Sequence, residues 1–123
     1  MDKIKILYVD EEQNNLNAFT AYFRRLEAFQ PISSLTITEA LKHIEEWINV
    51  LIIDHSILEE IGLDFCLKPV LENTIIIAVT TYRNLEMLEF AVAQKLIFNY
   101  HCKPFDFEDL HKSINEAIAC SNS

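Results

Sequence analysis

Short, almost uninterrupted apolar segments are the feature that most limits what this chain can fold into. Three of them are rich in β-branched and aromatic residues, at positions 4–9, 50–53 and 74–79. A strand that is apolar along its whole length must be covered on both faces, which is typical of a parallel sheet enclosed between helices. Two weaker candidate strands lie at positions 31–34 and 98–102.

Four segments between and after these strands carry apolar residues at helical spacing. The positions are Leu16, Phe19, Phe23 and Leu26; Ala40, Leu41, Ile44, Trp47 and Ile48; Leu85, Leu88, Ala91 and Val92; and Leu110, Ile114, Ala117 and Ile118. Each set forms one apolar stripe along a helix, so we expect Trp47 to lie in the core. A further helix is expected over residues 61–71, where Pro69 makes the end of the helix difficult to place.

The order of these elements is strand then helix, repeated about five times. Strands that alternate with helices form a parallel sheet with helices on both faces, and right-handed crossovers leave few topologies. Two helix starts support this order. Thr36 and Glu39 have the spacing of a capping box, and Asp106 is the expected N-cap of the last helix. In open sheets of this kind, ligands bind beyond the carboxyl ends of the strands.

Charged and hydroxyl side chains follow four of the expected strands. They are Asp10, Glu11 and Glu12 after the first strand, Asp54 after the third, Thr80 and Thr81 after the fourth, and Lys103 after the fifth. Clustered carboxylates repel one another, and a hard cation such as Mg²⁺ relieves that repulsion. A transferring phosphoryl group needs Mg²⁺, an ammonium and a hydroxyl around its oxygens. The pattern therefore predicts that Asp54 is a nucleophile that forms an acyl phosphate.

Composition argues against several other classes of protein. Acidic residues outnumber basic residues 19 to 10, for a formal net charge of −9, which disfavours binding to nucleic acid or to a membrane surface. The single glycine, Gly62, rules out a Walker loop or a dinucleotide fingerprint. No apolar run approaches the ~18 residues of a transmembrane helix, and the N-terminus lacks a signal-peptide pattern. Three cysteines without CxxC spacing favour a reduced, cytoplasmic protein.

Five motifs in order point to one family. They are the acidic pair Asp10-Glu11, Asp54 after an apolar strand, Gly62 eight residues later, Thr80 at the end of the fourth strand, and Tyr100 three residues before Lys103-Pro104. With these motifs the chain resembles the receiver domain of two-component response regulators over essentially its whole length. The resemblance implies a flavodoxin-like (βα)5 fold, a three-layer sandwich around a five-stranded parallel sheet of order 2-1-3-4-5. We expect residues 1–123 to form one domain, and an output domain, if the protein has one, would lie beyond them.

The resemblance also implies a phosphoryl-transfer role for the motif residues. Asp54 is expected to accept a phosphoryl group from a histidine kinase or a phosphotransfer protein. Glu11 and Asp54 are expected to ligate Mg²⁺, with Asp10 acting through water and the backbone carbonyl of Ser56 as a further ligand. Lys103 is expected to contact the phosphoryl oxygens. Such a domain assists only its own phosphorylation and dephosphorylation and is not a turnover enzyme.

A conformational switch is the other implication of the resemblance. Thr80 is expected to bond to the phosphate once it is present, and Tyr100 is expected to follow it inward. The change would alter the face made of the fourth helix, the fifth strand and the fifth helix. That face would contact an unknown downstream protein or output domain.

Departures from the family pattern keep two alternatives open. Glu11 stands where Asp is commoner, and Leu58 stands where Pro is usual. Both changes give weight to a pseudo-receiver, which keeps the fold and signals by protein contact without phosphorylation. The other alternative is a flavodoxin-like cofactor-binding or hydrolytic enzyme. The chain has no Ser/Thr/Gly-rich phosphate loop for a flavin, and Ser56 stands where a dehalogenase-type hydrolase has a second Asp.

Overall fold

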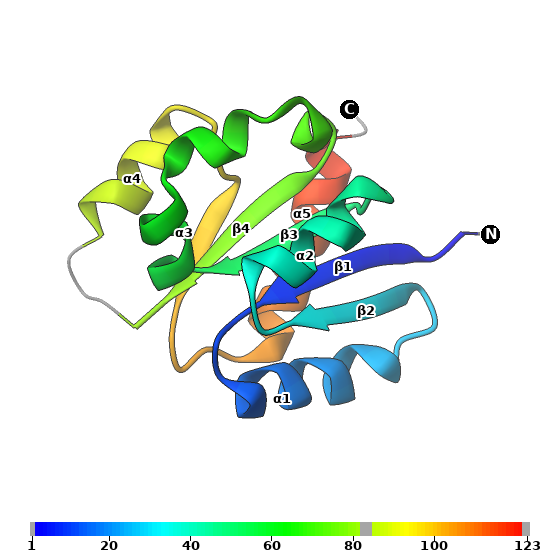
Figure 1. Ribbon diagram of the computed structural model, residues 1–123. Coiled ribbons are helices and arrows are strands. Elements are labelled where there is room, and N and C mark those ends of the chain that lie inside the picture. Colours follow the sequence, from blue (N-terminus) through cyan, green and yellow to red (C-terminus); the bar gives the residue numbers. More distant parts are fainter. Residues whose placement is uncertain (1, 82–84, 122–123) are drawn as a thin grey trace.

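The computed structural model describes residues 2–81 and 85–121, and strands and helices alternate along them (Figure 1). The elements are β1 (Ile4–Val9), α1 (Gln13–Arg24), β2 (Phe29–Ser34), α2 (Ile37–Glu45), β3 (Val50–Asp54), α3 (His55–Ile61), the 3-10 helices η1 (Leu63–Leu67) and η2 (Pro69–Leu71), β4 (Ile75–Thr80), α4 (Glu86–Ala93), β5 (Asn99–Cys102) and α5 (Phe107–Ser121). The strands form one parallel sheet of order β2-β1-β3-β4-β5. This confirms the expected flavodoxin-like topology.

Helices cover both faces of the sheet and make three layers (Figure 1). Successive residues of β1 point to opposite faces. Leu7 and Val9 belong to the core that contains residues of α2, α3 and α4, whereas Ile6 and Tyr8 belong to the core that contains residues of α1 and α5. The central strand β3 is buried along its whole length. Two cores flank the sheet, which is why the central strands are apolar at every position rather than at alternate ones.

Side-chain caps start two of the helices as the sequence predicts. The backbone N–H of Glu39 donates to Thr36 Oγ1 at 3.2 Å at the start of α2. The backbone N–H of Glu108 donates to Asp106 Oδ1 at 2.9 Å at the start of α5. These bonds satisfy backbone donors that have no partner within the helix. Within the described residues, no helix is long and apolar enough to cross a membrane.

The helix expected over residues 61–71 was wrong in position and type. The α-helix in this part of the chain is α3, which begins directly after Asp54 and ends at Ile61. Gly62 then adopts φ 88° and ψ 153°, a conformation that helices do not contain and that suits glycine. The chain continues as two 3-10 helices, and Pro69 begins the second, where its missing N–H costs no hydrogen bond.

Trp47 was wrongly expected in the core. Helix α2 ends at Glu45, two residues before Trp47. Trp47 adopts a left-handed conformation, with φ 72°, and its surface is 48% exposed. The turn into β3 breaks the helical spacing here, and Ile48 takes the buried position instead. The apolar stripe of the sequence therefore continues past the end of the helix.

The conformation of Gly62 generates a stability prediction. An added Cβ would meet no atom within 4 Å, so a side chain here costs backbone strain alone. We expect Gly62→Ala to lower the free energy of unfolding by about 1–3 kcal/mol in urea denaturation. Gly62→Ser should cost about the same, because both substitutions add a Cβ in open space and both impose the same backbone strain. A cost that grows steeply from Ala to Ser would contradict this and would indicate a steric clash.

Candidate functional site

The carboxyl ends of four parallel strands meet at one rim of the sheet. Asp10 follows β1, Asp54 ends β3, Thr80 ends β4, and Lys103 follows β5. A small cavity of about 120 Å³ opens at this rim. It is lined by Asp10, Glu11, Glu12, Asp54, His55, Ser56, Thr81 and Lys103. The fold therefore brings the predicted acidic residues, Ser56 and the lysine together around one small space.

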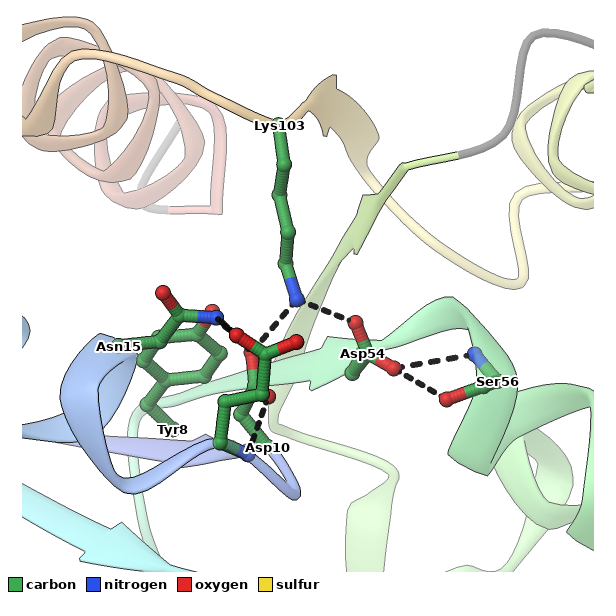
Figure 2. Close-up of polar contacts among 7 residues, drawn as sticks. Tyr8, Asp10, Asn15, Asp54, Ser56 and Lys103 are labelled. Atoms are coloured by element: carbon green, nitrogen blue, oxygen red, sulfur yellow. Dashed lines mark hydrogen bonds and ion pairs between the residues drawn. The ribbon is translucent and has the colours of Figure 1, made fainter.

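The Lys103 ammonium lies between two carboxylates (Figure 2). Its Nζ is 2.7 Å from Asp10 Oδ2 and 2.6 Å from Asp54 Oδ1. The backbone N–H of Lys103 also donates to the carbonyl of Thr80 at 2.6 Å, which ties the end of β5 to the end of β4. The backbone hydrogen bond fixes the position of the Lys103 main chain, and the two carboxylates fix the position of its ammonium group.

Burial and ion pairing shift the pKa values of Lys103 and Asp10 in opposite directions. Burial alone would lower the pKa of Lys103, but its hydrogen bonds to Asp10 and Asp54 raise that pKa above the usual value. Burial alone would raise the pKa of Asp10. Hydrogen bonds from Lys103, from Tyr8 and from the backbone of Glu12 together lower it instead. Both groups are therefore held in their charged forms, because each is paired where water is largely excluded.

Asp10 accepts hydrogen bonds at both oxygens (Figure 2). Oδ2 accepts from the Tyr8 hydroxyl at 2.6 Å, from Lys103 Nζ at 2.7 Å and from Asn15 Nδ2 at 3.2 Å. Oδ1 accepts from the backbone N–H of Glu12 at 2.9 Å. Asp10 is almost fully buried, so these donors replace the water that it would otherwise bind.

Sequence analysis missed Tyr8 and Asn15 as part of the site. Tyr8 lies within an apolar strand, and an aromatic residue there is typical of the core. One signal was present, because Tyr8 and Asp10 are two residues apart and side chains at that spacing share a face of the sheet. Asn15 lies in the first turn of α1, where nothing in the sequence indicates which way its amide points.

Both oxygens of Asp54 also have partners (Figure 2). Oδ1 faces Lys103, and Oδ2 accepts from the backbone N–H of Ser56 at 3.2 Å and from the Ser56 hydroxyl. Asp54 is therefore the N-cap of α3, which explains why that helix starts immediately after β3. Its side chain is 12% exposed, which leaves a path to the carboxylate from the rim.

The donor set of this rim suits a hard divalent cation. Glu11 and Glu12 are exposed beside Asp10 and Asp54, so four carboxylates face one ammonium. Oxygen ligands of this kind are those that Mg²⁺ prefers. In the part of the chain that the structure describes, however, no three His, Cys, Asp or Glu side chains already stand in an arrangement that holds a metal ion. The donor set of the rim therefore fits Mg²⁺ in its chemistry, without a preformed cluster of ligands among the described residues.

The expected switch residues, Thr80 and Tyr100, are not among the residues that line the cavity. Thr80 is completely buried, and it is Thr81 that lines the cavity. Tyr100 lies on β5, paired in register with Ala78, and packs against the core beneath α4. Burial, and then the charge of Glu89 on α4, raises the pKa of the Tyr100 hydroxyl. The motion of Tyr100 stays a prediction.

Comparisons with solved structures place this fold among receiver domains. No family model and no curated protein matches the chain. A response regulator receiver domain from Clostridium thermocellum shares 25% sequence identity, with a TM-score of 0.81 and 97% of each chain covered. The receiver domain of an HD domain-containing protein from Pseudomonas fluorescens shares 18%, with a TM-score of 0.82 and 98% of each chain covered.

A third solved structure is a response regulator from Burkholderia pseudomallei, with a phosphorylated aspartic acid, a calcium ion and citrate. It shares 20% identity with a TM-score of 0.75, over 96% of this chain and 72% of that one. These likenesses show that the chain has the fold of response regulator receiver domains.

The two pKa shifts predict how the ion pair contributes to stability with pH. The pKa of Asp10 falls below its usual 3.8, so the contribution is complete above that value and is lost as the pH falls through the lower, folded-state pKa. The pKa of Lys103 rises above its usual 10.5, so the contribution is complete below that value and is lost as the pH rises through the higher, folded-state pKa.

We therefore expect wild type to exceed Lys103→Met in free energy of unfolding by a constant amount between about pH 5 and pH 9. The difference should shrink toward both extremes, as measured by urea unfolding at a series of pH values. Lys112→Met, at an exposed lysine of α5, is the matched control and should differ little from wild type at any pH. A difference for Lys103→Met that is independent of pH would show that the ion pair contributes nothing.

Proposed function

We propose that this chain is a phosphoacceptor receiver domain, which takes a phosphoryl group from the phosphohistidine of a histidine kinase or phosphotransfer protein onto Asp54. The observation that carries the proposal is the Lys103 ammonium held between Asp10 and Asp54 at the carboxyl rim of the sheet. A cation in this position is available to the oxygens of a phosphoryl group that bonds to Asp54. The receiver-domain fold supports the same function.

In the proposed reaction, a carboxylate oxygen of Asp54 attacks the phosphorus and forms an acyl phosphate. The bond between phosphorus and the donor's imidazole nitrogen breaks, and the nitrogen keeps the electron pair and gains a proton. Lys103 exchanges its contact with Asp54 Oδ1 for a phosphoryl oxygen and stays paired with Asp10. Hydrolysis of the acyl phosphate by water releases inorganic phosphate and restores the carboxylate. In each cycle, the domain accepts one phosphoryl group on Asp54 and releases it as phosphate, so it acts only on its own acyl phosphate.

Mg²⁺ would be held by Glu11, by Asp54 and by the backbone carbonyl of Ser56. When bound, it supplies positive charge that offsets the repulsion between the carboxylates and the phosphoryl group. Asp10 is suited to act through water rather than directly, because its oxygens already accept four hydrogen bonds. The Burkholderia response regulator, whose structure contains both a phosphorylated aspartic acid and a calcium ion, supports a divalent cation in a protein of this fold.

The switch would run from the rim to the face made by α4, β5 and α5. Thr80 lies at the end of β4, next to Asp54 on the neighbouring strand, so its hydroxyl is within reach of a phosphoryl group after a small shift. Tyr100 follows on β5 and packs beneath α4. A downstream protein or output domain would then respond to that face. Free thiols at Cys66 and Cys102 suit a reducing compartment such as the cytoplasm.

A pseudo-receiver is the second candidate, and one observation favours it. Asp54 already has partners at both oxygens, with Ser56 at one and Lys103 at the other. A phosphoryl group must displace at least one of them. In a pseudo-receiver these contacts would be permanent, and the same face would bind its partner without phosphorylation.

Intact mass measurement tests the proposed function directly. We expect incubation with acetyl phosphate and Mg²⁺ to add the mass of one phosphoryl group, and to add much less without Mg²⁺. Asp54→Asn should abolish the gain, whereas Asp64→Asn, at an exposed carboxylate of η1, should keep it. Absence of any gain in folded wild type would favour the pseudo-receiver, and a gain that persists in Asp54→Asn would place the acceptor elsewhere.

Two neighbouring glutamates test the metal ligands. Glu11→Gln should weaken Mg²⁺ binding by about tenfold or more in isothermal titration calorimetry, because it removes a charged ligand. Glu12→Gln is the matched control, since Glu12 lines the same cavity but is not a proposed ligand. We expect its effect to be about twofold, as for a charge that acts only at a distance. Equal effects of the two substitutions would remove Glu11 from the ligand set.

A further inference from the structure

We infer that the hydroxyl of Tyr8 is a positioning group for the Asp10–Lys103 ion pair, and through this pair for phosphoryl transfer. The effect on transfer rests on the proposed function, whereas the effect on the ion pair does not. Tyr8 touches neither the phosphoacceptor nor the proposed metal ligands Glu11 and Ser56 in the contacts that the structure shows. It acts through Asp10.

Packing fixes the ring of Tyr8. The residue lies inside β1 and is completely buried. Its ring meets the ring of Phe19 on α1 edge to face, with 5.2 Å between the centroids and 72° between the planes. The hydroxyl of a buried tyrosine is costly unless it has a partner, so its direction matters as much as its packing.

The hydroxyl is directed at Asp10 (Figure 2). It donates to Oδ2 at 2.6 Å, a short bond of the charge-assisted kind. Burial, and next the hydrogen bond with Asp10, raises the pKa of Tyr8 far above its usual value. The phenol therefore stays protonated and can only donate to this carboxylate.

The same oxygen of Asp10 receives Lys103, and the three donors differ in how firmly they are held. Lys103 reaches Oδ2 through a long side chain with four rotatable bonds, and Asn15 reaches it from a partly exposed position at 3.2 Å. Tyr8 has a packed ring and two rotatable bonds, so it loses little freedom by holding its place. Tyr8 therefore sets the position of Oδ2, and Oδ2 sets the position of the ammonium.

A neighbouring cavity explains what the hydroxyl prevents. A space of about 340 Å³ lies beside the ion pair, and its lining includes Tyr8, Lys103, Phe105 and Phe107. Without the hydroxyl, the buried lone pair of Asp10 would lose its fixed partner, and water from this space would take its place. Because water is less constrained than a packed phenol, Asp10 and Lys103 would sample a wider range of positions.

The test combines Tyr8→Phe with Lys103→Met in a double-mutant cycle, using the rate of labelling by acetyl phosphate at saturating Mg²⁺. We expect Tyr8→Phe alone to slow labelling by about tenfold, as for a lost hydrogen bond to a charged group. The Mg²⁺ concentration for half the maximal rate should change by less than about twofold, because the proposed ligands remain. In the Lys103→Met background, Tyr8→Phe should change the rate little further.

Phe19→Leu separates positioning from packing, since it removes the ring contact and keeps the hydroxyl. We expect it to lower stability but to label at a rate within about twofold of wild type. An equal slowing by Phe19→Leu and Tyr8→Phe would overturn the inference, because packing would then explain both. A wild-type rate for Tyr8→Phe would also overturn it.

Urea unfolding gives a readout that needs no phosphorylation. It uses the four proteins of the double-mutant cycle: wild type, the two single variants and the double variant. The cost of Tyr8→Phe should be larger in the Lys103→Met background, where the hydroxyl is a more important remaining partner of Asp10. An identical cost in both backgrounds would overturn the inference. If wild type is not labelled at all, the proposed function fails, and this cycle alone decides whether Tyr8 positions the ion pair.

Discussion

The ammonium of Lys103 is the group on which this rim depends. Parallel strands β1 and β3 are neighbours, and Asp10 directly after β1 and Asp54 at the end of β3 lie at the same edge of the sheet. Two carboxylates so close together oppose each other's ionisation, and burial adds to that cost. Lys103 reaches across from the far side of β4 and contacts both. Because the fold brings the strand ends together, the two carboxylates repel each other. Lys103, directly after β5, offsets this repulsion by pairing with both.

The parts of the fold that follow from the sequence are those set by pattern alone. The apolar runs locate the strands with errors of at most two residues at either end, because a strand buried on both faces has to be apolar throughout. The misplaced elements follow from local geometry that a pattern does not contain. Asp54 starts α3 by capping it, and the turn after α2 takes Trp47 out of its apolar stripe. Both errors lie at element ends, where one side chain or one backbone angle decides the outcome.

The same division applies to the site. The sequence placed Asp10, Asp54 and Lys103 at one rim because strand order and direction dictate it. It did not indicate which oxygen of Asp10 meets which donor, or that Tyr8 takes part, because those contacts depend on rotamers and on the packing of α1 against the sheet. It assigned the phosphate contact to Thr80, by resemblance, but did not indicate that Thr80 is buried and that the adjacent Thr81 lines the cavity. The sequence is enough to predict which residue types lie at the strand ends, whereas their hydrogen-bond partners can be identified only from the structure.

The hydrogen bonds divide the acidic pair into two unequal members. Asp10 is almost fully buried, and its two oxygens accept hydrogen bonds from four donors. The bonds from Tyr8 and Lys103 are the shortest of the four. Glu11 is exposed and lines the rim cavity. Under the proposed function, the extra methylene of Glu11 lengthens the reach of a carboxylate that already lines the cavity. Asp10 is thus the buried counter-charge of Lys103, whereas Glu11 is the exposed member of the pair and the one proposed as a ligand for an incoming cation.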